Sequence, residues 1–178
     1  MATKLSDPLL TLARTVILIV QTILGIAAAA LIFGIPFVIF GRGIIIAEIQ
    51  KETGAATATF PSLEIAAVMA LGLAIVVLSF LFLRYLRRIV DTVGEGDPFI
   101  PVNAERLTAM AWMMVAVQVL ALAILPLIIR VQTAFEETRP SLETDVDIGG
   151  IVLAITLFIL ARVFRHGAAM RADLEGTV

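Results

Sequence analysis

Four apolar segments, each long enough to cross a lipid bilayer, constrain the fold of this chain more than any other feature. They cover approximately residues 15–40, 63–83, 107–129 and 148–164. A spanning helix needs about 20 mainly apolar residues to cross roughly 30 Å of hydrocarbon. Because lipid offers the backbone no hydrogen-bond partners, such segments must form helices. We therefore expect an all-α integral membrane protein.

The composition of the chain leads to the same expectation. Its 178 residues are 60% hydrophobic and 16% charged, with a mean hydropathy of +1.05. Soluble domains are about 45–50% apolar and about 25% charged, and a soluble domain of this size could not bury so much apolar surface. We expect a single transmembrane domain over residues 1–178, surrounded by the lipid bilayer.

Lys and Arg are divided unequally between the two sides of the predicted helices. An excess of basic residues marks the cytoplasmic side of a membrane protein, and this rule places both termini in the cytoplasm. Nine of the 13 basic residues then lie inside and four outside, while the third connection is rich in acidic residues. The inside set is Lys4, Arg14, Arg84, Arg87, Arg88, Arg106, Arg162, Arg165 and Arg171; the outside set is Arg42, Lys51, Arg130 and Arg139; the acidic residues are Glu136, Glu137, Glu143, Asp145 and Asp147.

The connections between the apolar segments are short, which predicts antiparallel neighbours in an up-down-up-down four-helix bundle. The second helix is expected to continue past the membrane as a short cytoplasmic extension. From Tyr85 to Val93, apolar residues recur at helical spacing opposite a basic face. Gly94, Gly96 and Pro98 are then expected to end this helix.

Two cytoplasmic segments follow from this topology, a loop over residues 84–106 and a tail over residues 165–178. In the loop, Asn103 is expected to cap the third helix, and Glu105 to complement the helix dipole in the first turn. The tail is expected to continue the fourth helix out of the membrane. If it folds back, the loop and the tail form one cytoplasmic surface.

The residues that would support catalysis or cofactor binding are scarce. The chain has no Cys and one His, His166, and its His and carboxylate residues do not cluster at ligand spacing. We therefore expect no catalytic residue, no metal site and no cofactor, haem included. The net charge of −2 argues against direct nucleic-acid binding. Gln21 and Gln118, the large polar residues within the predicted spans, are expected to make interhelical hydrogen bonds.

Two segments on the predicted cytoplasmic side carry short motifs. They are Gly96-Asp97-Pro98-Phe99 followed by Asn103 and Arg106-Leu107, and Val163-Phe164-Arg165-x-Gly167 followed by Met170-Arg171 and the ending Leu174-Glu175-Gly176-Thr177-Val178. The first resembles the G-x-P-F…N…R-L signature, and the second the C-terminal pattern, of the bacterial four-helix membrane family numbered 2975 among the domains of unknown function. This resemblance implies an inner-membrane protein of undefined activity, often encoded beside a small helix-turn-helix regulator of the Cro/repressor type.

Our first functional hypothesis is therefore a non-enzymatic inner-membrane protein that binds and regulates a soluble cytoplasmic partner, such as a helix-turn-helix transcription regulator. A simpler interpretation of the arginines is contact with anionic lipid headgroups. The candidate partner-binding residues are Arg87, Arg88, Pro98, Phe99, Asn103, Arg106, Phe164, Arg165, Gly167 and Arg171.

Two alternatives remain open at this point. One is a small transporter or channel, acting as a homo-oligomer, in which Pro36 and Pro126 would form gating kinks and Gln21 and Gln118 would line the path. The sparse polarity of the spans counts against it. The other is an accessory subunit of a larger membrane complex.

Overall fold

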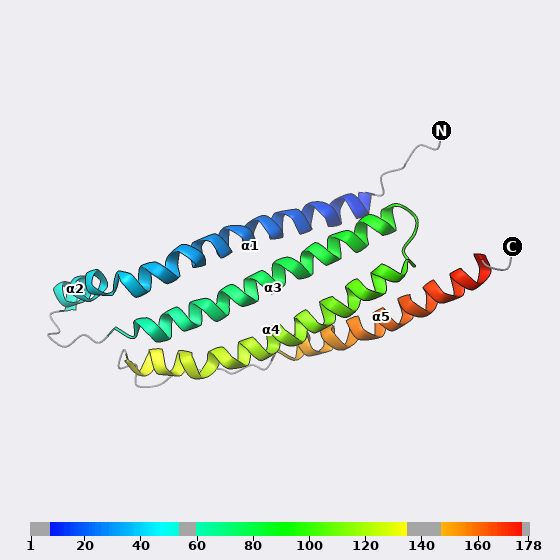
Figure 1. Ribbon diagram of the computed structural model, residues 1–178. Helices are drawn as coiled ribbons and strands as arrows, with labels where there is room; N and C mark the ends of the chain where they lie inside the picture. Colours follow the sequence, from blue (N-terminus) through cyan, green and yellow to red (C-terminus); the bar gives the residue numbers. More distant parts are fainter. Residues whose placement is uncertain (1–7, 54–59, 135–146, 176–178) are drawn as a thin grey trace. The chain divides into compact units, whose positions relative to one another are not determined.

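The computed structural model describes residues 8–53, 60–134 and 147–175. These residues form five helices and no strand, in the order α1 (Pro8–Phe40), α2 (Arg42–Thr53), α3 (Ser62–Gly94), α4 (Pro101–Ala134) and α5 (Ile148–Glu175) (Figure 1). Four of them, α1, α3, α4 and α5, are long and apolar enough to cross a membrane. The predicted all-α membrane fold is confirmed.

The helices extend beyond the predicted spans. α3 has 33 residues, which corresponds to about 50 Å at 1.5 Å per residue, well above the roughly 30 Å of bilayer hydrocarbon. As predicted, α3 continues past its arginines and ends at Gly94, and α5 continues to Glu175. Since α4 begins at Pro101, the predicted loop over residues 84–106 shortens to a connection over residues 95–100.

One helix, α2, was not predicted. Its isoleucines lie mostly near its start, charged and polar residues follow them, and its apolar run is too short to cross a bilayer, so no spanning helix was expected there. A pair between Lys51 Nζ and Glu48 Oε1, 3.5 Å apart on adjacent turns, is consistent with its helical path. Several residues that supported the predicted topology lie outside the described residues: Lys4, Glu136, Glu137, Arg139, Glu143, Asp145, and residues 176–178 of the C-terminal motif.

The helices divide into two packing units. Unit 1 contains the described parts of Met1–Gly25, Leu78–Gln118 and Asp147–Val178, and unit 2 those of Ile26–Val77 and Val119–Val146. Within unit 2, α1 approaches α3 at Gly34, where an added Cβ would lie 2.7 Å from the Cε atom of Met69. The candidate site described below belongs entirely to unit 1.

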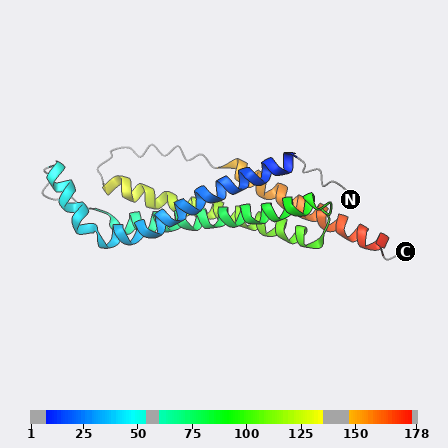
Figure 2. The same cartoon turned by 90° about the horizontal axis from the view of Figure 1, so that it is seen from above.

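The core of unit 1 is built from α3, α4 and α5. Figures 1 and 2 both place the last turns of α3 beside the first turns of α4, joined by the 95–100 connection. Edge-to-face packing of Trp112 and Phe158, with ring centroids 5.5 Å apart, joins α4 to α5. The buried residues of this core are Ile89, Leu107, Met110, Ala111, Leu157 and Ala161.

Small residues allow α5 to pack closely in this unit. Ala154, Ala161 and Ala168 are buried at seven-residue intervals, and Leu157 lies between them on the same face. Alanine at these positions lets helix backbones approach one another, which is a common way to pack helices in lipid. The other side of α5 exposes apolar residues such as Ile151, Ile155 and Ile159, as expected for a surface that faces lipid.

Candidate functional site

The end of α3 is fixed by its glycine. Gly96 has a φ of +87°, a left-handed conformation that favours glycine. Its N–H donates to the Val93 carbonyl at 3.0 Å, and the Asp97 N–H donates to the Thr92 carbonyl at 3.1 Å. This pair of hydrogen bonds is the Schellman arrangement, in which a left-handed residue ends a helix and satisfies its last carbonyls. The chain therefore leaves α3 in a defined direction at Asp97.

Asn103 holds the connection against both helices. Its side chain is fully buried, with 0% exposure. The Nδ2 atom donates to the Thr92 hydroxyl at 2.8 Å and to the Pro98 carbonyl at 2.9 Å, while Oδ1 accepts a hydrogen bond from Arg106 Nη1 at 2.9 Å. Because a buried amide is costly unless its donors and acceptors are paired, these three contacts specify one position of the loop.

The capping role predicted for Asn103 is wrong. α4 begins at Pro101, so Asn103 is the third residue of the helix and points its side chain back to the loop and to α3. Proline suits a first helical position because it has no N–H to leave unpaired and its φ is already helical. Glu105 lies one residue beyond the first turn, which contains no acidic residue, so its predicted dipole role is wrong as well.

Arg106 links α4 to the backbone of α3. Its Nη1 atom donates to the Arg88 carbonyl at 3.2 Å as well as to Asn103 Oδ1. The guanidinium is thus occupied by two internal acceptors. A second cation, Arg14 of α1, pairs with Asp91 of α3 at an Nε–Oδ1 distance of 2.8 Å. Both arginines hold helices together at this end of unit 1.

The connection also binds to α5. The Phe99 ring lies 5.2 Å from the Phe164 ring, centroid to centroid, at an interplanar angle of 41°. Gly167 leaves room for it, since a Cβ there would lie 2.8 Å from Phe99 Cδ1. Arg171 Nη1 forms an ion pair with Asp97 Oδ1. We refer to Asp91–Arg106 and Phe164–Arg171 together as the junction.

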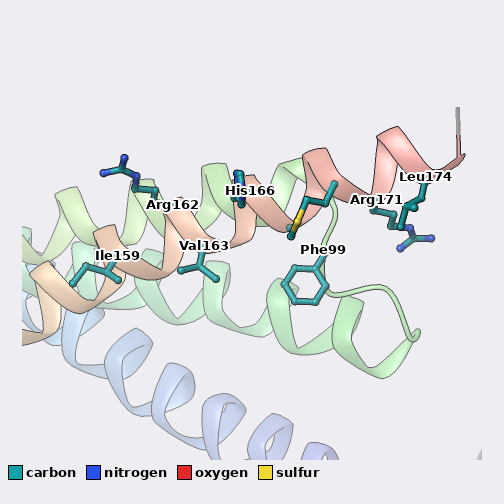
Figure 3. Close-up of a pocket in the computed structure, with 9 residues that line it drawn as sticks. Phe99, Ile159, Arg162, Val163, His166, Arg171 and Leu174 are labelled. Carbon is teal, nitrogen blue, oxygen red and sulfur yellow. The ribbon is translucent and has the colours of Figure 1, made fainter. Parts of the chain in front are cut away.

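Beside the junction lies an open groove along α5, with a volume of about 900 Å³. Figure 3 shows Phe99 reaching from the connection toward α5, with Ile159 near one end of the groove and Leu174 at the other. Phe99 is 41% exposed and Leu174 is 71% exposed. The lining residues are Phe99, Ile159, Arg162, Val163, His166, Gly167, Met170, Arg171 and Leu174.

The candidate residues named from the sequence fall into two groups. Pro98, Phe99, Asn103, Arg106, Phe164, Gly167 and Arg171 are brought together in the junction, where they contact one another. The remaining three, Arg87, Arg88 and Arg165, are partly or fully exposed, and Arg88 contributes its backbone carbonyl. A partner-binding role for any of them stays a prediction.

Sequence reasoning missed several residues of this site. Thr92 and Asp97 were not among the candidate residues, although each holds one of them in place. The groove residues Ile159, Val163 and Met170 were not chosen as candidates because they continue an apolar helix that the membrane interpretation already explained. Their spacing of four and seven residues was the available signal, since it marks one helical face.

Interhelical hydrogen bonds were predicted for both Gln21 and Gln118, and the structure tests only the second. Gln118 Nε2 donates to Asp147 Oδ2 at 2.9 Å, just before α5 begins, and Asp147 Oδ1 accepts the Gly150 N–H at 3.0 Å. Gln118 makes a hydrogen bond as predicted, but its acceptor is Asp147, the residue that precedes α5, rather than a residue within a helix. This contact also shows that α5 starts beside the middle of α4. Gln21 is buried in unit 1, and its interhelical bond stays a prediction.

Comparison with protein families identifies the chain. Residues 45–178 match the family model described as "Protein of unknown function (DUF2975)". The chain belongs to this family. The range that DUF2975 covers contains α3, α4, α5 and the whole junction, so the arrangement described here lies within the family's own segment. No curated protein and no solved structure matches the chain.

Proposed function

We propose that this DUF2975 protein is a non-enzymatic, multi-pass protein of the bacterial inner membrane that binds and regulates a soluble cytoplasmic partner. In this proposal the start of α1, the junction and the end of α5 face the cytoplasm, as the excess of Arg and Lys at these segments favours. The observation that carries the proposal is the open groove beside a junction whose polar groups are already paired internally.

A preformed surface of this kind suits protein binding. The connection is held by Asn103, by the Phe99–Gly167 contact and by the Asp97–Arg171 pair. Little conformational entropy would therefore be lost in this region when a partner binds. Exposed apolar residues beside basic ones supply both the buried area and the charge that protein interfaces use.

The family resemblance makes a helix-turn-helix transcription regulator the first partner to test. The DNA-binding surface of such a protein is basic, because it neutralises phosphates. The ionisable side chains that line the groove are all of basic residues: Arg162, His166 and Arg171. Repulsion would keep the DNA-reading face away from the groove, so the regulator would bind through another face and be controlled by its retention at the membrane.

The transport alternative is less well supported. It relied on Gln21 and Gln118 as the lining of a polar path. The amide of Gln118 instead donates a hydrogen bond to Asp147, the residue before α5, and so links α4 to the start of α5. The accessory-subunit alternative is tested by the purification of the full-length protein described next.

The test is purification of the tagged full-length protein from its native bacterium in mild detergent, combined with fractionation of a deletion strain. We expect one soluble protein in stoichiometric amount, which moves from the membrane to the cytosolic fraction on deletion and returns on complementation. Recovery of integral membrane subunits alone would favour the accessory role. An empty preparation, with no soluble protein redistributed by the deletion, would contradict partner binding.

A further inference from the structure

α5 carries a second apolar stripe that its own unit does not cover. Ile159, Val163, Met170 and Leu174 line the groove on one side of the helix, whereas the buried stripe runs through Ala161 and the other small residues of the opposite face. Leu174 is 71% exposed and Met170 is 53% exposed. An apolar stripe of this length on a helix that leaves the membrane indicates a surface that is covered by another molecule.

The length of α5 argues for a protein as the covering molecule. Arg162 is the first charged residue of the helix and therefore marks the approximate edge of the hydrocarbon. Leu174 is twelve residues further along, about 18 Å at 1.5 Å per residue. The headgroup layer on one side of a bilayer is only about 5–8 Å thick. Lipid can therefore cover the groove near Ile159, but it does not reach Leu174.

The charges along the groove indicate what kind of protein surface fits. Among the residues that the structure describes, the ionisable ones that line it are Arg162, His166 and Arg171, and none is a carboxylate. Arg171 is paired with Asp97 on the side of the connection, whereas Arg162 has no ion pair among the residues that the structure describes. A complementary surface would place acidic side chains beside an apolar stripe.

We propose that the groove binds an acidic amphipathic helix of the soluble partner. This inference rests on the proposed function and adds the chemistry of the bound segment. From Arg162 to Leu174 the groove spans about 18 Å of helix outside the hydrocarbon, which accommodates a partner helix of about 12 residues. Its apolar residues, at spacings of three and four, pack on Val163, Met170 and Leu174, and its carboxylates lie beside Arg162.

Site-specific photo-crosslinking in the native bacterium tests this inference on the full-length protein. A benzophenone amino acid replaces Met170 or Leu174 in the groove, and Ala172, an exposed residue outside the groove lining, serves as the control position. We expect adducts from the two groove positions to the soluble protein found by co-purification. Mass spectrometry should place the attachment in an acidic amphipathic helix, with a yield at least about tenfold above that at Ala172.

A charge reversal supplies a matched pair of variants. Arg162→Glu lies in the groove, whereas Arg84→Glu makes the same change on an exposed residue of α3 outside its lining. Since like charges across an interface are strongly unfavourable, Arg162→Glu should lower the crosslinking yield at Met170 by about tenfold or more. Arg84→Glu should leave that yield within about twofold of the unchanged protein.

Other crosslinking results would each contradict a specific part of the proposal. Adducts to phospholipid alone, or to a second copy of this chain, would mean that the groove has a different occupant. Attachment to a basic or non-helical segment of the partner would refute the acidic helix and leave partner binding intact. A partner that co-purifies but never crosslinks from the groove would place docking elsewhere, whereas the absence of any soluble partner would refute the proposed function itself.

Discussion

The ring of Phe99 occupies the space that a side chain at position 167 would need. A Cβ atom on Gly167 would lie 2.8 Å from Phe99 Cδ1, closer than real Cβ atoms approach, and 3.1 Å from Cε1. The two residues come from the α3–α4 connection and from α5, and both belong to the motifs that carry the family resemblance. The two motifs therefore meet in a direct contact between loop and helix.

Replacing this glycine should weaken the junction. Gly167→Ala forces the Phe99 ring to move, and overpacking of this kind costs about 1–3 kcal/mol. Gly25→Ala is the control, since a Cβ at Gly25 meets nothing within 4 Å and alanine is the better helix former. Thermal unfolding in detergent should show a lower midpoint for Gly167→Ala than for Gly25→Ala.

A double-mutant cycle identifies the cause of that loss. If Phe99 is the obstacle, combining Gly167→Ala with Phe99→Ala should cost less than the sum of the two single changes. Strict additivity, or a Gly167→Ala protein as stable as Gly25→Ala, would show that the contact between the ring and the glycine does not determine how α5 packs here.

Loss of the Asn103 side chain should loosen the connection. In Asn103→Ala, the Pro98 carbonyl and the Arg106 guanidinium each lose a buried partner. An unpaired buried polar group costs about 1–3 kcal/mol. We expect a lower unfolding temperature and faster amide hydrogen exchange in residues 95–100. Thr156→Ala removes an exposed hydroxyl that bonds only within its own helix turn, so it should change stability by about 0.5 kcal/mol or less.

Hydrogen exchange separates the two roles considered for Asn103. If the residue mainly contacts a partner, exchange in the purified protein will be the same with and without the substitution. If it holds the loop, protection will be lost in residues 95–100 even when no partner is present. The internal bonds of Asn103 favour the second result.

The contact between Gln118 and Gly150 gives a third prediction. A Cβ at Gly150 would lie 1.7 Å from Gln118 Nε2, so Gly150→Ala must displace the Gln118 amide and break its bond to Asp147. We expect Gly150→Ala to lower the thermal stability in detergent, whereas Gly72→Ala, where a Cβ meets nothing within 4 Å, should be neutral or slightly stabilising.

The same residues distinguish a structural role from transport. If Gln118 serves α5, Gln118→Leu will lower stability without creating or abolishing flux across proteoliposomes. A solute flux that the wild-type protein supports and Gln118→Leu abolishes, with stability unchanged, would instead revive the transport alternative. Equal stability of Gly150→Ala and Gly72→Ala would show that the Gln118 side chain can move away from an added methyl group at position 150 at little cost.

Local patterns in the sequence determined the class of fold and the position of most helices. The length and apolarity of the segments specify spanning helices because lipid leaves the backbone no other way to pair its polar groups. The end of α3 was equally predictable, since Gly96 can adopt the left-handed conformation that closes a helix at little cost. α2 escaped prediction because its mixed pattern fits neither a spanning helix nor an obvious amphipathic one.

The arrangement of the site was decided by tertiary structure. Asn103 has the residue type of a helix cap, and only the position of α3 and of Pro98 shows that its amide is used across the loop. Asp97 and Arg171 are 74 positions apart in the sequence, and no local pattern relates them. Helix formation depends on residues within about one turn of each other, so it can be predicted from local patterns in a single sequence. The pairing of distant side chains depends on how whole helices pack, and a single sequence contains no local pattern that predicts this packing.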